Sequence, residues 1–164
     1  MSSEKTVLYE SLKSIFLHID NHEKAFLSQF NLTIPRFFTL VHLRKNPTIS
    51  PLALADLLLC TKSNVSRIVQ GMLDDGLIDR QDHPTDKRSF QLSLTPSGDA
   101  LLDEVYPAYE KLVNDLMSSF NPEQLALYTE VSQHIESTLA PNGTGTLTNT
   151  QASLGPVARS WRLR

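Results

Sequence analysis

The chain has 164 residues, of which 40% are hydrophobic and 20% are charged. This composition is typical of a folded globular protein and excludes a chain that is disordered throughout. The single Cys60 excludes an intrachain disulfide and Cys-rich metal clusters, and it fits a reducing cytoplasm. The polar N-terminus and the lack of any apolar run of about 18 residues lead us to expect neither a signal peptide nor a membrane span.

The formal net charge of -3 is distributed unevenly along the chain. Residues 36–96 carry eight Lys or Arg against six Asp or Glu, whereas residues 101–136 carry seven acids and one lysine. A mildly basic middle followed by an acidic region indicates a nucleic-acid-facing part joined to a part with another role.

Helix starts are marked by a capping side chain followed by proline, at Ser50-Pro51, Thr95-Pro96 and Asn121-Pro122. Thr33, with Pro35 two residues later, is a looser form of the same signal. Together with apolar residues at helical spacing, these signals predict helices over about residues 5–29, 33–45, 50–58, 61–75, 96–119 and 122–139. Pro107 is expected to remove one backbone hydrogen bond from the fifth helix and to kink it.

Residues 78–95 have the pattern of a β-hairpin that follows directly on a helix pair. Phe90, Leu92 and Leu94 alternate with polar residues, which is the period of a half-buried strand. The turn before them is longer than the two to five residues that a hairpin usually needs. The preceding helices, over residues 50–58 and 61–75, are joined by about three residues, the length expected of a helix-turn-helix.

The second helix of this pair is predicted to turn a polar face outward. On a helical wheel its apolar residues fall on one side, and the other side carries Ser63, Asn64, Ser66, Arg67 and Gln70. Arg can pair with guanine, and Gln or Asn with adenine, in the major groove of double-stranded DNA. Thr61 and Lys62 lie at the predicted helix N-terminus, where free N–H groups favour a phosphate.

A hairpin that follows a recognition helix is a wing, and its tip can reach the adjacent minor groove. The narrow minor groove concentrates negative potential that attracts Arg or Lys. We therefore expect Arg88 to enter this groove, Asp86 to orient its guanidinium and Lys87 to contact the DNA backbone. His83 and Thr85 complete the predicted DNA-binding set of the wing.

Three segments of the sequence resemble the MarR family of winged helix-turn-helix regulators. LALADLLLCTKSNVSRIVQGMLDDGLI resembles the family's helix-turn-helix, and HPTDKRSFQLSLTPSG resembles its wing, with Asp-x-Arg and Leu-Thr-x-x-Gly. LTIPRFFTLVHL resembles the segment before them. Together with the helical order, the resemblance covers about residues 5–140. His83 departs from it, because an Asp usually stands there.

The resemblance implies a mainly α fold with a small β-hairpin wing. It implies a winged helix-turn-helix DNA-binding domain over residues 32–96 and a helical dimerisation lobe formed by residues 1–31 and 97–140. It also implies a cytoplasmic homodimeric regulator, usually a repressor, that reads a near-palindromic operator and responds to a small-molecule effector without a cofactor. The composition of residues 141–164, rich in Thr, Gly and Asn with three arginines, indicates a flexible basic tail.

Other residues admit more than one interpretation. An effector pocket where the two lobes meet would involve aromatic side chains that are otherwise core residues, namely Phe26, Phe30, Phe37, Phe38 and His42. Cys60 would serve a redox-responsive regulator, but its position favours a small apolar group in the helix-turn-helix core. His18 and His22 have a spacing that can bind a metal, but we expect surface histidines and no metal site.

Two further function classes remain as alternatives to a DNA-reading regulator. A winged helix can serve as a protein-interaction module without DNA binding, which would place an apolar patch on the recognition face. An enzyme is disfavoured, because the sequence has no Gly-rich phosphate loop, nucleophile elbow or Cys–His signature.

Overall fold

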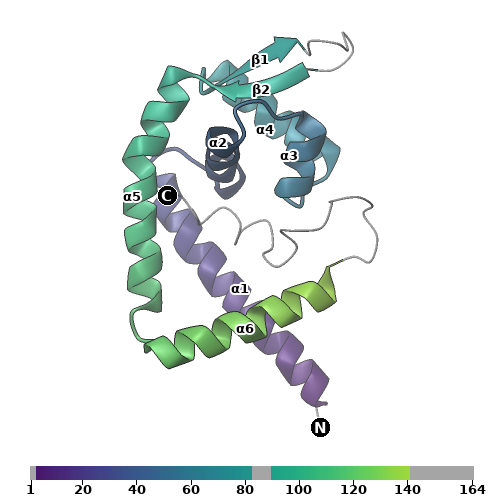
Figure 1. Cartoon of the computed structure of the whole chain (residues 1–164), viewed down its shortest axis with the longest axis vertical. Coiled ribbons are helices and arrows are strands. Elements are labelled where there is room, and N and C mark those ends of the chain that lie inside the picture. Colours follow the sequence, from purple (N-terminus) through teal and green to yellow (C-terminus); the bar gives the residue numbers. More distant parts are fainter. Residues whose placement is uncertain (1–2, 83–89, 141–164) are drawn as a thin grey trace.

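The computed structural model describes residues 3–82 and 90–140. Within them the chain forms α1 (Glu4–Ser28), α2 (Ile34–Lys45), α3 (Pro51–Leu57), α4 (Lys62–Asp74), β1 (Ile78–Asp82), β2 (Phe90–Leu94), α5 (Pro96–Met117) and α6 (Pro122–Leu139), as Figure 1 shows. This order confirms the predicted mainly α fold with a β-hairpin wing. α5 continues as a single helix through Pro107.

Three of the predicted helix starts are capped as the sequence indicated. The Oγ of Ser50 accepts a hydrogen bond from the backbone N–H of α3, and Thr95 does the same for α5. Asn121 and Gln124 form a reciprocal capping box, with N–O distances of 2.9 and 3.0 Å. Thr33 makes no side-chain cap, although α2 begins after it. Each capped start satisfies a backbone N–H that a helix otherwise leaves unpaired.

The ends of α1, α3 and α4 share one backbone motif. Each is followed by a residue in the left-handed conformation: Asn31 at φ 54°, Leu59 at φ 51° and Gly76 at φ 67°. After α3, the N–H of Cys60 reaches the carbonyl of Ala55 at 3.0 Å, and the other two ends close in the same way. Glycine and asparagine accept this conformation readily, whereas leucine is strained there.

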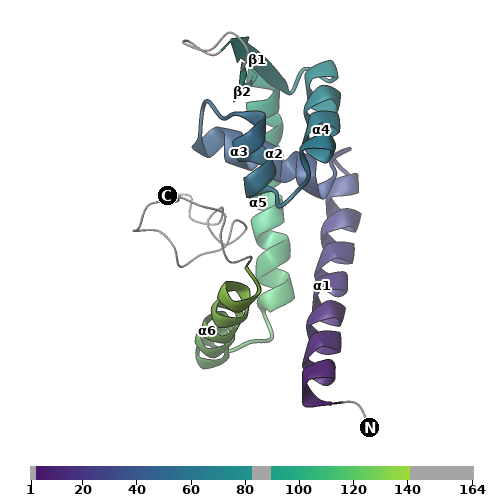
Figure 2. The same ribbon diagram turned by 90° about the vertical axis from the view of Figure 1, so that its right-hand side faces the viewer.

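The buried core centres on α2. Its residues 37–43 are all buried, and side chains from α3, α4, the hairpin and α5 pack around them. Leu102, Val105 and Tyr109 of α5 belong to this same cluster. In contrast, Leu27 is the only buried residue of α1, and α6 has none. As far as Tyr109, α5 is therefore packed against α2 to β2 (residues 34–94, the winged region), whereas α6 stands clear of this region (Figure 2).

The start of α5 is fitted closely against the base of the hairpin. Thr95 Oγ1 donates to the carbonyl of Gly76 at 2.7 Å and accepts from the N–H of Gly98 at 3.0 Å. A Cβ on Gly98 would lie 2.0 Å from the carbonyl oxygen of Leu77, closer than any side-chain carbon can approach. The backbone contact at this junction therefore requires glycine.

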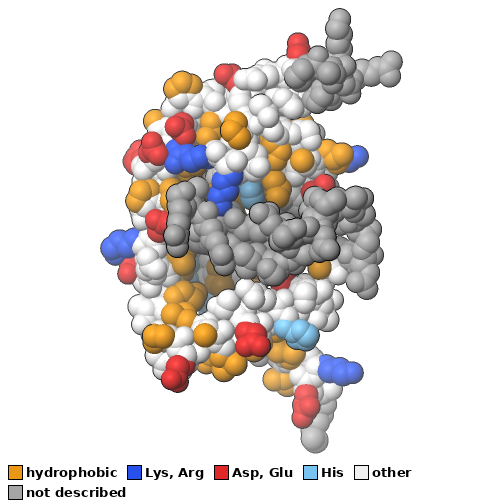
Figure 3. Space-filling view, in the orientation of Figure 1, with side chains coloured by type: hydrophobic (Ala, Val, Ile, Leu, Met, Phe, Trp, Pro, Cys, Tyr) orange, Lys and Arg blue, Asp and Glu red, His pale blue; other side chains and the backbone are white. Residues whose placement is uncertain are grey.

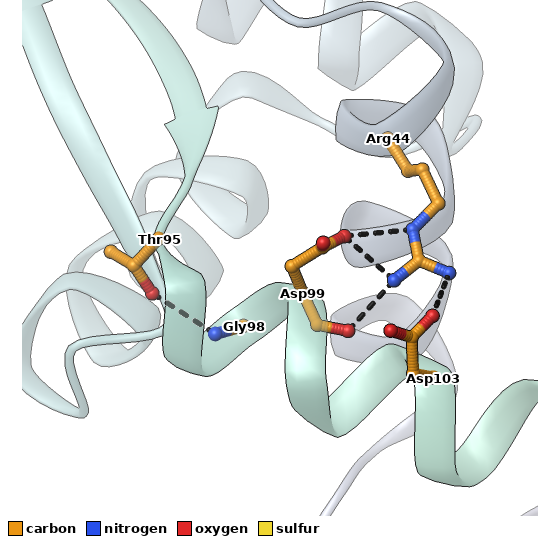
Figure 4. Close-up of polar contacts among 5 residues, drawn as sticks. All are labelled: Arg44, Thr95, Gly98, Asp99 and Asp103. Atoms are coloured by element: carbon orange, nitrogen blue, oxygen red, sulfur yellow. Dashed lines mark hydrogen bonds and ion pairs between the residues drawn. The ribbon is translucent and has the colours of Figure 1, made fainter.

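Arg44, at the end of α2, holds α5 in the same place (Figure 4). Its Nη2 lies 2.6 Å from Asp99 Oδ1 and 2.7 Å from the Asp99 carbonyl, and its Nη1 lies 2.9 Å from Asp103 Oδ1. A planar guanidinium engaged on several edges fixes direction as well as distance. α2 and the first turns of α5 thus form one rigid unit.

The hairpin strands pair antiparallel, with Ile78 opposite Leu94 and Arg80 opposite Leu92. Ile49 adds an isolated bridge to Leu92, which anchors the hairpin to the segment before α3. No helix in the described part of the chain combines the length and apolar character needed to cross a membrane.

Candidate nucleic-acid interface

α4 presents its polar face to solvent. Val65, Val69 and Met72 are buried on the other side of the helix, against the core. The five side chains predicted to face outward are all exposed: Ser63, Asn64, Ser66, Arg67 and Gln70. The helical wheel is therefore confirmed, and the exposed face bears donors and acceptors instead of an apolar patch.

Part of this polar set is used inside the helix itself. Thr61 Oγ1 caps α4 by accepting from the N–H of Asn64 at 3.4 Å, and it lies 3.1 Å from Ser63 Oγ. The hydroxyl of Ser66 donates to the carbonyl of Lys62 at 2.9 Å. These hydroxyls stabilise the N-terminal turn that would meet a phosphate.

The acids at the end of α4 are both engaged. Asp74 Oδ1 accepts a hydrogen bond of 2.8 Å from Gln70 Nε2, and Asp75 forms an ion pair with Arg36 of α2. Arg36 lowers the repulsion that Asp75 would exert on a phosphate. Within the described residues, the side-chain carbonyl of Gln70 and its second amide hydrogen make no hydrogen bond, and these are the two groups that pair with adenine. The Gln70–Asp74 spacing could have predicted their contact, whereas Arg36 lies 39 residues from Asp75.

The wing is described only along its strands. The tip residues His83, Thr85, Asp86, Lys87 and Arg88 lie outside the described residues, so their predicted contacts stay predictions. On the strands, the guanidinium of Arg80 lies 3.9 Å from the ring centroid of Phe90. The sequence interpretation did not select Arg80.

The four arginines of the described residues divide into two kinds. Arg36 and Arg44 are ion-paired with acids of neighbouring helices. Arg67 and Arg80 make no ion pair within the described part of the chain, and both are exposed. The first pair maintains the fold, whereas the second pair, on α4 and the wing, carries charge that remains available to an anion.

The four phenylalanines predicted for an effector pocket lie together at the junction of α1, α2 and α5. Phe26 lies 5.3 Å from Phe30, and the rings of Phe37 and Phe38 lie 4.6 and 6.2 Å from Tyr109 (centroid distances). His42 is buried on α2, four residues after Phe38. Burial, with a smaller effect from nearby Lys45, lowers the pKa of His42 to about 4. The sequence interpretation missed Tyr109, whose only signal is its helical spacing with other apolar residues.

Two tyrosines add polar groups to this aromatic cluster. The hydroxyl of Tyr109 donates to Glu23 Oε1 of α1, and burial raises the pKa of Glu23. The hydroxyl of Tyr106 is buried and has no hydrogen-bond partner in the described residues. Its ring stacks with Phe37 at 6.4 Å. A buried polar atom without a partner is costly, and a bound molecule could satisfy it.

Comparison with known proteins identifies similar sequences among HTH-type transcriptional regulators. Residues 32–90 match the model of the MarR family. The HTH-type transcriptional regulator BilQ of Clostridioides difficile (strain CD3) is 26% identical over 121 residues, which cover 71% of this chain and 82% of that protein.

Solved structures show the same fold. Sco3205, a MarR family transcriptional regulator from Streptomyces coelicolor in complex with DNA, has a TM-score of 0.78 and 23% identity, covering 87% of this chain and 95% of that one. A mutant MarR from E. coli complexed with operator DNA has a TM-score of 0.73 and 20% identity, covering 84% and 96%.

The fold and the exposed face of α4 define the class of this protein, a winged helix-turn-helix transcription regulator. Its residues 32–90, which hold the helix-turn-helix and most of the hairpin, match the MarR family model, and a curated HTH-type regulator is similar to it over 71% of its length. The resemblance seen in the sequence is confirmed. So is the expectation that the chain is not an enzyme, because the relatives are transcriptional regulators.

Proposed function

We propose that this chain is a homodimeric repressor that binds a near-palindromic double-stranded operator and is released or retained by a small-molecule effector. The observation that carries the proposal is the face of α4, where Arg67, Gln70 and short polar side chains are exposed beside a wing. Each protomer would read one half-site, with half-sites about one helical turn apart. Because its target is DNA, we place the protein in the cytoplasm.

The proposed dimer rests on apolar surface that the single chain leaves uncovered. Phe16 of α1 is 60% exposed and Leu127 of α6 is 55% exposed, and other large apolar side chains follow them along both helices. Figure 3 shows hydrophobic side chains gathered in the region of α6 and the end of α5. Exposed apolar patches of this kind mark interfaces. A second copy, joined through residues 1–31 and 97–140, would cover them.

The proposed effector site rests on the aromatic cluster. The rings of Phe26, Phe37 and Phe38 lie around Tyr109, and Phe30 packs on Phe26, at the point where α1 meets α2 and α5. His42 is buried on α2, four residues after Phe38. The unpartnered hydroxyl of Tyr106 supplies a hydrogen-bonding group there. An effector that binds only one arrangement of the DNA-binding domain and the dimerisation lobe increases the population of that arrangement. The affinity for DNA then changes to the affinity of that arrangement.

The alternatives have less support. A protein-interaction module would expose apolar residues on the outward face of α4, which is polar. A redox-responsive regulator would need an accessible thiol, whereas Cys60 is partly buried against the core.

Fluorescence anisotropy with the protein's own upstream DNA and a scrambled duplex tests the proposal. Arg67→Ala is expected to weaken operator binding by about 1–3 kcal/mol, as loss of one base contact does, with a smaller effect on the scrambled duplex. Arg88→Ala tests the predicted wing contact in the same way.

Lys111→Ala is the matched control, because it removes one exposed positive charge on α5, away from α4. Equal weak binding to both duplexes would require a selection from random sequences. The absence of sequence preference after that selection would refute the proposal.

A further inference from the structure

Arg80 is held in a defined orientation on the wing. Side chains alternate between the two faces of a strand, so Arg80 shares a face of the hairpin with Ile78 and with its partner Leu92. Its guanidinium lies over the ring of Phe90 at 3.9 Å. Stacking of this kind uses the flat face of the guanidinium and leaves the N–H donors at its edges. Arg80 therefore presents an oriented cation, although it is exposed.

Among the described residues, nothing neutralises the charge of Arg80. In the described ranges no carboxylate oxygen lies within ion-pair distance of it, even though Asp82 follows two residues later on the same face. Arg44 shows the opposite case, because two aspartates and a backbone carbonyl occupy its donors. Within the described residues, Arg80 is oriented by Phe90 and has no acid partner, so its donors face no anion of that part of the chain.

We propose that Arg80 binds a phosphate of the DNA backbone, and that Phe90 is the residue that holds its guanidinium in place. This inference rests on the proposed DNA-binding function and adds a contact to it. A phosphate matches the guanidinium fork, and backbone contacts set the register of a protein on DNA. Arg80 lies on β1 and not among the wing-tip residues, so this contact is separate from the one predicted for Arg88.

The test is the salt dependence of binding, measured by anisotropy on the operator and on the scrambled duplex. The slope of log affinity against log salt is negative, and each lost phosphate contact makes it shallower by about 0.9, which at roughly 0.1 M salt is about an eightfold loss of affinity. Two protomers make the expected change in slope about 1.8 for Arg80→Ala. The loss should be equal on both duplexes. Phe90→Leu keeps the charge and removes the ring, so it should cause a smaller loss with little change in slope.

Lys111→Ala serves again as the charge-matched control and should leave affinity and slope unchanged. Arg80→Gln, which keeps a long polar side chain, decides the matter if the alanine variant does not fold. An unchanged slope, or a loss confined to the operator, would overturn the phosphate contact while leaving the proposed function standing. Wild-type protein that binds neither duplex would overturn the proposed function itself, and with it this contact.

Discussion

Gly76, Gly71 and Leu59 test whether backbone conformation controls the stability of the helix ends and of α4. Gly76 has φ 67° and follows α4, Gly71 lies inside α4, and a Cβ on either would meet no atom within 4 Å. An added methyl group therefore encounters open space at Gly71 and at Gly76, and the two positions differ only in backbone conformation. Alanine in a left-handed conformation costs about 1–2 kcal/mol, whereas in a helix interior it is favoured over glycine by about 1 kcal/mol. Gly76→Ala should destabilise the protein, and Gly71→Ala should stabilise it.

Leu59 extends the same reasoning to a strained leucine. Its side chain is 76% exposed, so truncation removes little buried surface. Leu59→Ala keeps the strain at φ 51°, whereas Leu59→Gly relieves it but gives the unfolded chain more freedom. Relief of about 1–2 kcal/mol less an entropic cost of about 0.5–1 kcal/mol leaves the glycine variant up to about 1.5 kcal/mol more stable than the alanine variant, with a central value of about 0.75 kcal/mol.

Urea unfolding at one fixed protein concentration measures these differences, because the apparent stability of a dimer depends on concentration. The slope of free energy against urea should be the same in all variants. Effects of the same sign at Gly71 and Gly76, or a glycine variant at Leu59 that is no more stable than its alanine counterpart, would refute the reasoning.

Three other perturbations have defined outcomes. Gly98→Ala drives a Cβ to 2.0 Å from the Leu77 carbonyl oxygen and should lower the melting temperature sharply, whereas Ala100→Gly, inside the same helix, should cost only the helix propensity of about 1 kcal/mol. The pKa of His42 is about 4 when folded and near 6.5 when unfolded, so its stabilisation is present above pH 6.5 and is lost as pH falls toward 4. The loss is up to about 3 kcal/mol, and His42→Gln should remove that part of the pH dependence of unfolding. Phe16→Glu should give a monomer in sedimentation experiments, while Lys13→Glu, at an exposed polar position of α1, should not.

Features that depend on neighbouring residues could be predicted from the sequence. Capping by Ser50, Thr95 and Asn121 uses groups within one helical turn, so residue type and spacing are sufficient. The polar face of α4 follows from its helical period, and the strand Phe90–Leu94 from its alternation. For the same reason the DNA-facing residues of α4 were selected correctly as exposed, whereas their contacts with DNA stay predictions.

Contacts between residues far apart in the sequence could not be predicted from residue type and spacing. Arg44 and Asp99 are separated by 55 positions, and Tyr109 and Glu23 by 86. Nothing in the local pattern distinguishes the arginines that bind neighbouring helices from those left unpaired, so Arg80 was passed over. The left-handed turn at Leu59 was concealed because leucine occupies a position where glycine would have marked it.

α5 connects the winged region, which carries the predicted polar face of α4, to α1, and it does so through long-range contacts that the sequence did not indicate. Its first turns are held to α2 by Arg44 and to the hairpin by Gly98, so they cannot tilt without moving the winged region. Three turns further along, Tyr109 joins the same helix to Glu23 of α1. A change in the aromatic cluster that separated α5 from α1 would therefore move the whole winged region as a rigid body. In the proposed dimer this displacement sets the distance between the two α4 helices. Effector response would then depend on these long-range contacts, and base recognition on the local pattern of α4.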